Sequence, residues 1–258
     1  MIVINCRICQ KKAAKLFSGK LLSYSVSYYE CTDCGYVQTE APYWLNQAYA
    51  VAINDSDTGI MARNNVNARI VLATLWMLGA LDDTLVDCAG GYGILVRLLR
   101  DYGINAKWID PFCENLVARG FEYSGEQATL VTAFEAFEHF EYPSDELDHL
   151  LTIAPNILLS TEVIASPTPR QVDWWYYGKE HGQHIGFFKL NTLELMAKKR
   201  GKFLTSNGRS YHLMTDKPVH LNVWNFLIKA NRLIPFFLSN QLKSKIWADH
   251  ELMAKLDN

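Results

Sequence analysis

Residues 87–93 read Asp87-Cys88-Ala89-Gly90-Gly91-Tyr92-Gly93, and this stretch decides the fold class. An apolar run over 85–89 leads into it, and residues with helical spacing follow it as far as Gly103. Gly91 and Gly93 let the backbone approach a bound ligand closely. A glycine-rich turn between a strand and a helix is typical of doubly wound α/β sheets, which bind ligands at the carboxyl ends of their strands. The stretch therefore predicts a ligand-binding turn in an α/β fold.

Two aspartates indicate what kind of ligand this turn would hold. A dinucleotide fingerprint needs a third glycine where Val96 stands, and the chain has no Gly-Lys-Ser/Thr sequence, which excludes a P-loop. Asp110 ends the next expected strand and can accept hydrogen bonds from the hydroxyls of a ribose. Asp87 opens the turn with a negative charge, which suits a cationic ligand better than a pyrophosphate.

Strand and helix signals alternate through the middle of the chain. Apolar residues recur at helical spacing over 66–77, and Gly79 suits the end of that helix. Further strands are expected at 107–110, 130–134 and 156–162, helices at 144–153 (capped by Ser144) and 191–201 (with a capping box of Asn191 and Glu194), and a closing strand pair at 203–205 and 210–214. We therefore expect a doubly wound, Rossmann-like sheet with a helical lead-in over 41–216, preceded by a cysteine module over 1–40 and followed by a helical tail over 217–258.

Four cysteines form two C-x-x-C pairs, Cys6 with Cys9 and Cys31 with Cys34. Two such pairs offer the four soft ligands that tetrahedral zinc prefers, so the spacing predicts a structural zinc ribbon. The alternatives are four unrelated thiols or a redox pair. Cys88 and Cys113 lie elsewhere in the chain and are expected to be packing residues.

Composition and apolar runs limit the expected partners and cellular location of the protein. Hydrophobic residues make up 49% of the 258, charged residues 20%, and the formal net charge is −2, so no general attraction to nucleic acid or acidic membranes is expected. No apolar run reaches the ~20 residues that cross a bilayer, and residues 1–10 lack the layout of a signal peptide, so we expect a cytoplasmic protein. The aromatic and basic tail is expected to pack on the domain itself, with a membrane surface or a partner subunit as alternatives.

The stretch 87–93 resembles the first motif of class I S-adenosylmethionine-dependent methyltransferases, with Ala89 in place of its first glycine. Asp110 matches the ribose-binding acid of that family. Residues 131–139, which end in Glu-Ala-Phe-Glu-His, resemble its segment after the fourth strand, and residues 184–188 with 192–193 resemble a later histidine segment. The resemblance implies S-adenosylmethionine as cofactor and, as its binding residues, Asp87, Ala89, Gly90, Gly91, Gly93, Asp110, Pro111, Phe134 and Glu135.

A zinc-binding N-terminus on such a domain is similar to that of sugar C-methyltransferases, and of related surface-polysaccharide methyltransferases. Two features differ. Those sugar enzymes carry a further C-terminal domain, for which this chain is too short, and their Glu-His-x-x-Tyr-Phe motif reads Gln183-His184-Ile185-Gly186-Phe187-Phe188 here. The resemblance implies a small acceptor, such as a nucleotide-linked or surface-polysaccharide sugar, and leaves open whether carbon, oxygen or nitrogen is methylated.

The segment 174–184 is dense in aromatic rings, histidines and one acid, and it follows the fifth expected strand. Histidine is the usual base for taking a proton from a methyl acceptor, so His184 is the first candidate, with His181 and Glu180 as groups that bind or orient substrate. Glu135 and Glu138 are expected to face the cofactor, and His139 to be catalytic or structural. The alternative is that the rings form core and the histidines satisfy local hydrogen bonds.

Three further questions stay open at the sequence level. Residues 57–64 would form either a lip over the cofactor or a helix N-cap with a solvated Arg63. A zinc-ribbon nucleic-acid methyltransferase is a competing function, but the first 40 residues carry only a slight excess of cations and the chain has no Asn-Pro-Pro-Tyr-like tetrapeptide. The second competing function is a methyltransferase-like module that binds the cofactor without turnover. The oligomeric state is not readable.

Overall fold

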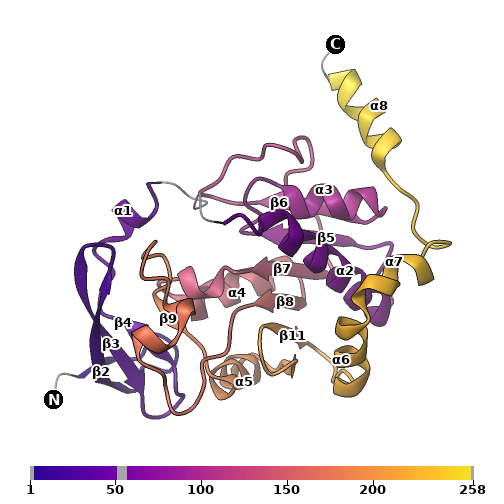
Figure 1. Ribbon diagram of the computed structural model, residues 1–258. Helices are drawn as coiled ribbons and strands as arrows, with labels where there is room; N and C mark the ends of the chain where they lie inside the picture. The colour runs from indigo at the N-terminus through magenta and orange to yellow at the C-terminus, as the bar shows by residue number, and fades with distance from the viewer. Residues whose placement is uncertain (1–2, 51–56, 257–258) are drawn as a thin grey trace. The chain divides into compact units, whose positions relative to one another are not determined.

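The structure, a computed structural model, describes residues 3–50 and 57–256, and it contains two sheets (Figure 1). A five-stranded sheet has the order β1-β2-β3-β4-β9 and a six-stranded sheet the order β10-β11-β8-β7-β5-β6. Two compact units share these elements: one comprises Met1–Asn54, Phe134–His149 and Leu159–Pro218, the other Asp55–Ala133, Leu150–Leu158 and Val219–Asn258. Strands β7 and β8 each run from one unit into the other.

The five-stranded sheet carries the paired cysteines. Its antiparallel strands are β1 (Val3–Asn5), β2 (Lys12–Leu21), β3 (Tyr24–Cys31), β4 (Val37–Thr39) and β9 (Gly186–Phe187). Inward-facing residues of β3, such as Val26 and Tyr28, pack in one apolar cluster with Phe187 and Trp44, which precedes the short helix α1 (Leu45–Ala48). The last strand comes from far along the chain, because Val37 pairs with Phe187. Sequence analysis predicted neither the hairpin of β2 and β3 nor this added strand.

The six-stranded sheet confirms the expected α/β fold. Its strands are β5 (Thr84–Cys88), β6 (Asn105–Ile109), β7 (Leu130–Phe134), β8 (Asn156–Ser160), β10 (Phe203–Ser206) and β11 (Tyr211–Thr215). β5 pairs in parallel with β6 on one side and with β7 on the other, so the chain reverses direction across the sheet at β5. This reversal is the switch point at which such sheets bind ligands. The closing pair β10 and β11 is antiparallel, so the sheet is mixed.

The main helices begin and end for local reasons. α2 (Ile60–Leu78) ends at Gly79 in the left-handed conformation, as predicted, and α3 (Ile94–Asp101) begins directly after Gly93. α4 (Pro143–Ile153) begins at Pro143, whose fixed φ suits a first helical turn, and Ser144 lies inside it.

The predicted capping box of Asn191 and Glu194 is wrong. α5 (Leu190–Lys199) begins earlier, after Lys189, and has no side-chain cap. The Lys189 ammonium instead forms an ion pair with Glu30, and the Thr192 hydroxyl donates to the Cys34 carbonyl. Contacts with distant residues therefore set this helix start.

The tail packs on its own unit, as expected. Its helices are α6 (Leu221–Lys229), α7 (Ile234–Phe237) and α8 (Ile246–Leu256), and α6 and α7 contact α2. Asp249 on α8 binds Arg97 and Arg100 of α3 through three hydrogen bonds of 2.6–2.7 Å. Among the described residues, none of the helices has the length and apolar character to cross a membrane.

Candidate active site and metal centre

The glycine-rich turn joins β5 to α3, as the sequence predicts, and its backbone is left-handed at three positions. Ala89, Gly91 and Gly93 have φ values of 58°, 54° and 85°. A Cβ atom at Gly90 would come within 2.6 Å of the Trp108 side chain, and the Trp108 indole donates a 2.9 Å hydrogen bond to the Gly91 carbonyl. Gly90 therefore leaves room for the Trp108 side chain, which covers one side of the turn.

Asp110 follows β6, and its carboxylate binds the glycine-rich turn. One carboxylate oxygen accepts from the Gly91 amide at 2.9 Å, and the other accepts from the amides of Phe112 and Cys113 at 2.8 and 3.0 Å. Because a carboxylate offers about four lone-pair positions, the acid keeps capacity for one further donor such as a ribose hydroxyl. Pro111, also predicted at the cofactor, follows it and is exposed.

Asp87 is buried at the end of β5. Its carboxylate accepts from the Thr132 hydroxyl at 2.6 Å. Burial raises the pKa of Asp87 to about 7, and the nearby negative charge of Asp110 adds to the rise. A cationic ligand at this position would favour the ionised carboxylate and relieve both effects. The turn, Asp110 and this buried carboxylate fit a positively charged adenosine cofactor.

A second group of acids follows β7. Phe134, the last residue of β7, lies edge-on to the Tyr211 ring, and Glu135 after it has an unusual φ of 49°. The Glu135 carboxylate and its amide both bond to the Ser160 hydroxyl, at 2.7 and 2.9 Å. A left-handed backbone at a non-glycine residue is strained, and such strain is concentrated at functional sites.

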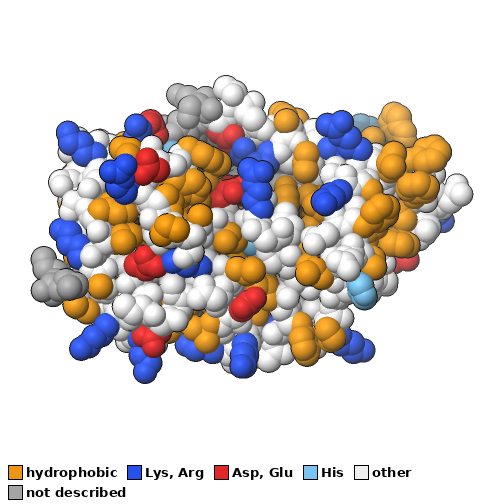
Figure 2. All heavy atoms as spheres, turned by 60° about the horizontal axis from the view of Figure 1, so that its bottom comes forward, with side chains coloured by type: hydrophobic (Ala, Val, Ile, Leu, Met, Phe, Trp, Pro, Cys, Tyr) orange, Lys and Arg blue, Asp and Glu red, His pale blue; other side chains and the backbone are white. Residues whose placement is uncertain are grey.

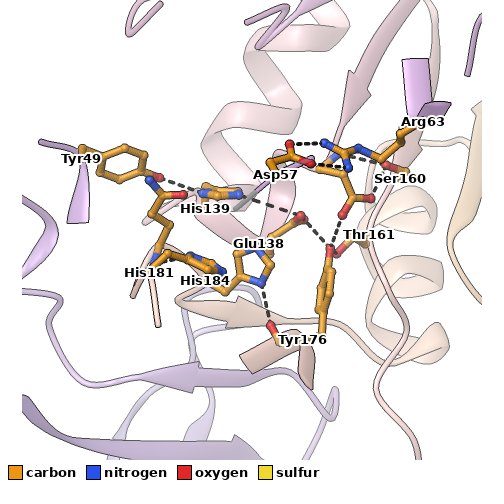
Figure 3. Close-up of polar contacts among 12 residues, drawn as sticks. Tyr49, Asp57, Arg63, Glu138, His139, Ser160, Thr161, Tyr176, His181 and His184 are labelled. Atoms are coloured by element: carbon orange, nitrogen blue, oxygen red, sulfur yellow. Dashed lines mark hydrogen bonds and ion pairs between the residues drawn. The ribbon is translucent and has the colours of Figure 1, made fainter. Parts of the chain in front are cut away.

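Tyr176 bridges the two acids (Figure 3). Its hydroxyl lies 2.6 Å from Glu138 and 3.2 Å from Glu135, and it belongs to the short 3-10 helix Trp175–Tyr177. Glu138 is fully buried, which raises its pKa to about 8, and the charge of Glu135 contributes to the rise. Within the described part of the chain, the second oxygen of Glu138 has no hydrogen-bond partner. Glu138 is therefore expected to stay protonated at neutral pH.

Two histidines complete the same group (Figure 3). The Nδ1 of His139 lies 2.9 Å from the Tyr49 hydroxyl, and the Nδ1 of His184 lies 2.6 Å from the Tyr176 carbonyl. Because a carbonyl can only accept, Nδ1 of His184 carries the proton and Nε2 of the neutral ring carries a lone pair. Burial is the main cause that holds the pKa of both rings below the ordinary value, that of His139 at about 3. The geometry gives His184 the tautomer of a proton acceptor.

The other two predicted catalytic residues lie differently. The His181 ring stacks edge-on to His184 with centroids 4.7 Å apart, and its Nδ1 accepts from the Gln183 amide. Glu180 is exposed, and its carboxylate lies 3.6 Å from the Lys179 ammonium. The structure therefore brings His181 next to His184 and leaves Glu180 at the surface.

Sequence analysis missed three contributors to this site. It included Tyr176 only as one of the aromatic rings of 174–184, and it did not single out Tyr49 or Ser160. Their roles come from contacts between positions as far as 90 residues apart, which carry no local signal.

The Arg63 side chain is not simply solvated, because its guanidinium binds Asp57 with two hydrogen bonds. The N-cap residue of α2 is Gly59.

The four paired cysteines converge in the five-stranded sheet. Sγ of Cys6 lies 3.6 Å from that of Cys34, and Sγ of Cys9 lies 3.4 Å from that of Cys31. All four sulfur atoms lie within 4.8 Å of one another, and the hydrogen bond from Cys34 lowers the pKa of Cys6 to about 5. Sulfur atoms bound to zinc at ~2.3 Å in a tetrahedron stand at about this spacing. The donor set therefore fits a four-thiolate zinc ion.

Comparison with known proteins identifies the domain. A family model described as a methyltransferase domain matches residues 62–205, more than half of the chain. No curated protein sequence matches.

Among solved structures, an O-methyltransferase family protein from Burkholderia thailandensis is similar with a TM-score of 0.50 and 13% identity, over 70% of this chain and 65% of that one. TnmH is similar with a TM-score of 0.47 and 15% identity, over 68% of this chain and 62% of that one. The chain thus spans less than two thirds of either protein, and at these identities the likeness concerns the fold alone. The family match over more than half of the chain shows that the chain belongs to the methyltransferase-domain family.

Proposed function

We propose that the protein transfers the methyl group of S-adenosylmethionine to a small acceptor, with His184 taking the acceptor's proton. The observation that carries this proposal is the hydrogen bond from His184 Nδ1 to the Tyr176 carbonyl, which leaves a lone pair on Nε2. Burial holds the pKa of His184 below its ordinary value, so the ring is unprotonated at neutral pH and its Nε2 lone pair is available to the acceptor's proton. Tyr176 and Glu138 position this group from the same cluster, and His181 orients substrate beside it.

The donor side uses the turn after β5 and the residues that follow β6 and β7. We assign cofactor binding to Asp87, Ala89, Gly90, Gly91, Gly93, Asp110, Pro111, Phe134 and Glu135. The buried carboxylate of Asp87 compensates the positive charge of the donor. The Asp110 carboxylate can accept one further hydrogen bond, from a ribose hydroxyl. S-adenosylmethionine supplies the methyl group as a sulfonium, so the protein's task is to align the acceptor and remove its proton.

A sugar-linked acceptor is our proposal for the substrate. Support comes from the resemblance of 184–188 and of the cysteine module to sugar C-methyltransferases, and from Trp175, which is exposed next to the cluster residue Tyr176. An exposed indole is a suitable platform for the apolar face of a pyranose. The four cysteines hold structural zinc in this proposal, since all four positions of the ion are filled by protein sulfur.

The test compares the parent protein with the His184→Ala variant and, as a matched control, with His250→Ala, an exposed histidine on α8. Calorimetric titration measures donor affinity, and a panel of nucleotide-linked sugars measures turnover. Loss of a general base lowers turnover by about 10²–10⁴-fold. We expect that loss in His184→Ala with donor affinity unchanged, and no loss in His250→Ala.

Two results would contradict the proposal. If the folded parent protein failed to bind S-adenosylmethionine, the cofactor assignment would be wrong. If His184→Ala kept full turnover, another group would be the base. Turnover of RNA in place of sugars would support the nucleic-acid alternative.

A further inference from the structure

The tail has an exposed apolar surface beside its packed one. Trp224, Leu227 and Ile234 are buried on the side of α6 and α7 that contacts α2. Other side chains of the same segment are exposed: Phe226 by 68%, Leu233 by 54%, Phe236 by 77% and Phe237 by 69%. Packing of the tail on its own unit therefore leaves these four apolar side chains uncovered.

Two exposed cations belong to the same segment. Lys229 and Arg232 are exposed between Phe226 and Phe236, and we call these two with the four apolar residues the tail patch. Residues 217–248 contain five Lys or Arg and no Asp or Glu, in a chain whose formal net charge is −2. Figure 2 shows hydrophobic side chains gathered at its right-hand side, with Lys and Arg side chains next to them. Positive charge is thus concentrated where the apolar side chains are exposed.

We propose that the tail patch binds an anionic lipid surface. Exposed aromatic rings enter the boundary between headgroups and acyl chains, and flanking Lys and Arg are attracted to anionic headgroups. A second copy of the patch would bring the same positive charges and no acidic side chain to pair with them, so a patch-to-patch contact is less suited to it than an anionic surface. Composition averaged over the whole chain hides this surface, since the remaining residues are acidic on balance.

The test is co-sedimentation of the full chain with vesicles of phosphatidylcholine alone or mixed with phosphatidylglycerol. We expect pelleting with the anionic vesicles only, and release at high salt, because the attraction to headgroups is screened. The double variants Phe236→Ser/Phe237→Ser and Lys229→Glu/Arg232→Glu are each expected to lower the partition coefficient at least about tenfold. Phe203→Ser, which alters an exposed phenylalanine on β10, is the control and should bind like the parent.

The four substituted tail residues are exposed, so the variants should fold, and unchanged thermal unfolding and S-adenosylmethionine binding would show it. The inference is overturned if the parent does not pellet with anionic vesicles, or if both double variants pellet as the parent does. It is equally overturned if light scattering shows a dimer that Phe236→Ser/Phe237→Ser converts to a monomer, which would assign the patch to self-association. None of these results bears on methyl transfer, which is measured separately.

Discussion

Ala89 has a backbone conformation that usually selects glycine. At its φ of 58° an alanine is strained by roughly 1–2 kcal/mol, whereas glycine is not. Glycine at this position costs about 0.5–1 kcal/mol in chain entropy. We therefore predict that Ala89→Gly raises the free energy of unfolding by up to about 1 kcal/mol.

Thermal and urea unfolding of the variant measure this prediction. Ala62→Gly, in the exposed first turns of α2, is the matched control and should lower stability by about 1 kcal/mol. A destabilised Ala89→Gly variant would show that the turn tolerates alanine without strain.

We expect Asp87 to make binding of the proposed cofactor depend on pH. Its folded pKa of about 7 lies above the ordinary 3.8, so the folded protein binds a proton that the unfolded chain has lost, and stability falls as pH rises from about 4 to 7. A cationic donor favours the ionised form. We predict that affinity for S-adenosylmethionine rises up to about tenfold between pH 6 and pH 8, measured by calorimetry.

Asp87→Asn cannot ionise and serves as the control for this effect. Its affinity should be low at both pH values and change little between them. A parent protein whose affinity is flat across the same range would contradict the role given to Asp87.

At the scale of elements, the cysteine cluster connects three strands and the turns between them. Cys31 ends β3, and Cys6 and Cys34 lie in the turns beside β1 and β4. Structural zinc contributes on the order of 10 kcal/mol of binding free energy. We predict one zinc per chain by elemental analysis, and loss of the ion with a lower melting temperature in Cys34→Ser.

The control for the zinc prediction is Cys113→Ser, which alters a cysteine outside the cluster. It should keep the metal and the melting temperature. Metal-free protein that melts as the parent does would show that the four thiols are not a zinc site.

Local sequence signals predicted some elements well and others not at all. The turn at 87–93 and the helix end at Gly79 depend on glycines within a few residues, so both were predicted correctly. The start of α5 was predicted wrongly, because Lys189 and Thr192 are held by Glu30 and Cys34. A capping pattern cannot register contacts with residues so far away in the chain.

At the scale of the whole molecule, the same contrast holds for the site. The residues proposed to bind the donor lie in the turn after β5 and directly after β6 and at the end of β7, and local motifs single them out; their role stays a prediction. The histidine cluster needs Tyr49, His139 and Tyr176, which only the tertiary structure brings together. His184 was singled out from its residue type and its position in the motif, but the hydrogen bond that sets its tautomer could not be foreseen.

The pairing of β9 with β4 has a consequence for biosynthesis. Gly186 pairs with Gln38 of β4, and a Cβ atom at Gly186 would collide with the Tyr36 hydroxyl. A ribosome that has made only the first hundred residues has already released all four cysteines but not this strand. The nascent module therefore leaves the edge of β4 unpaired until residue 187 emerges, and during that interval it is open to pairing with other chains.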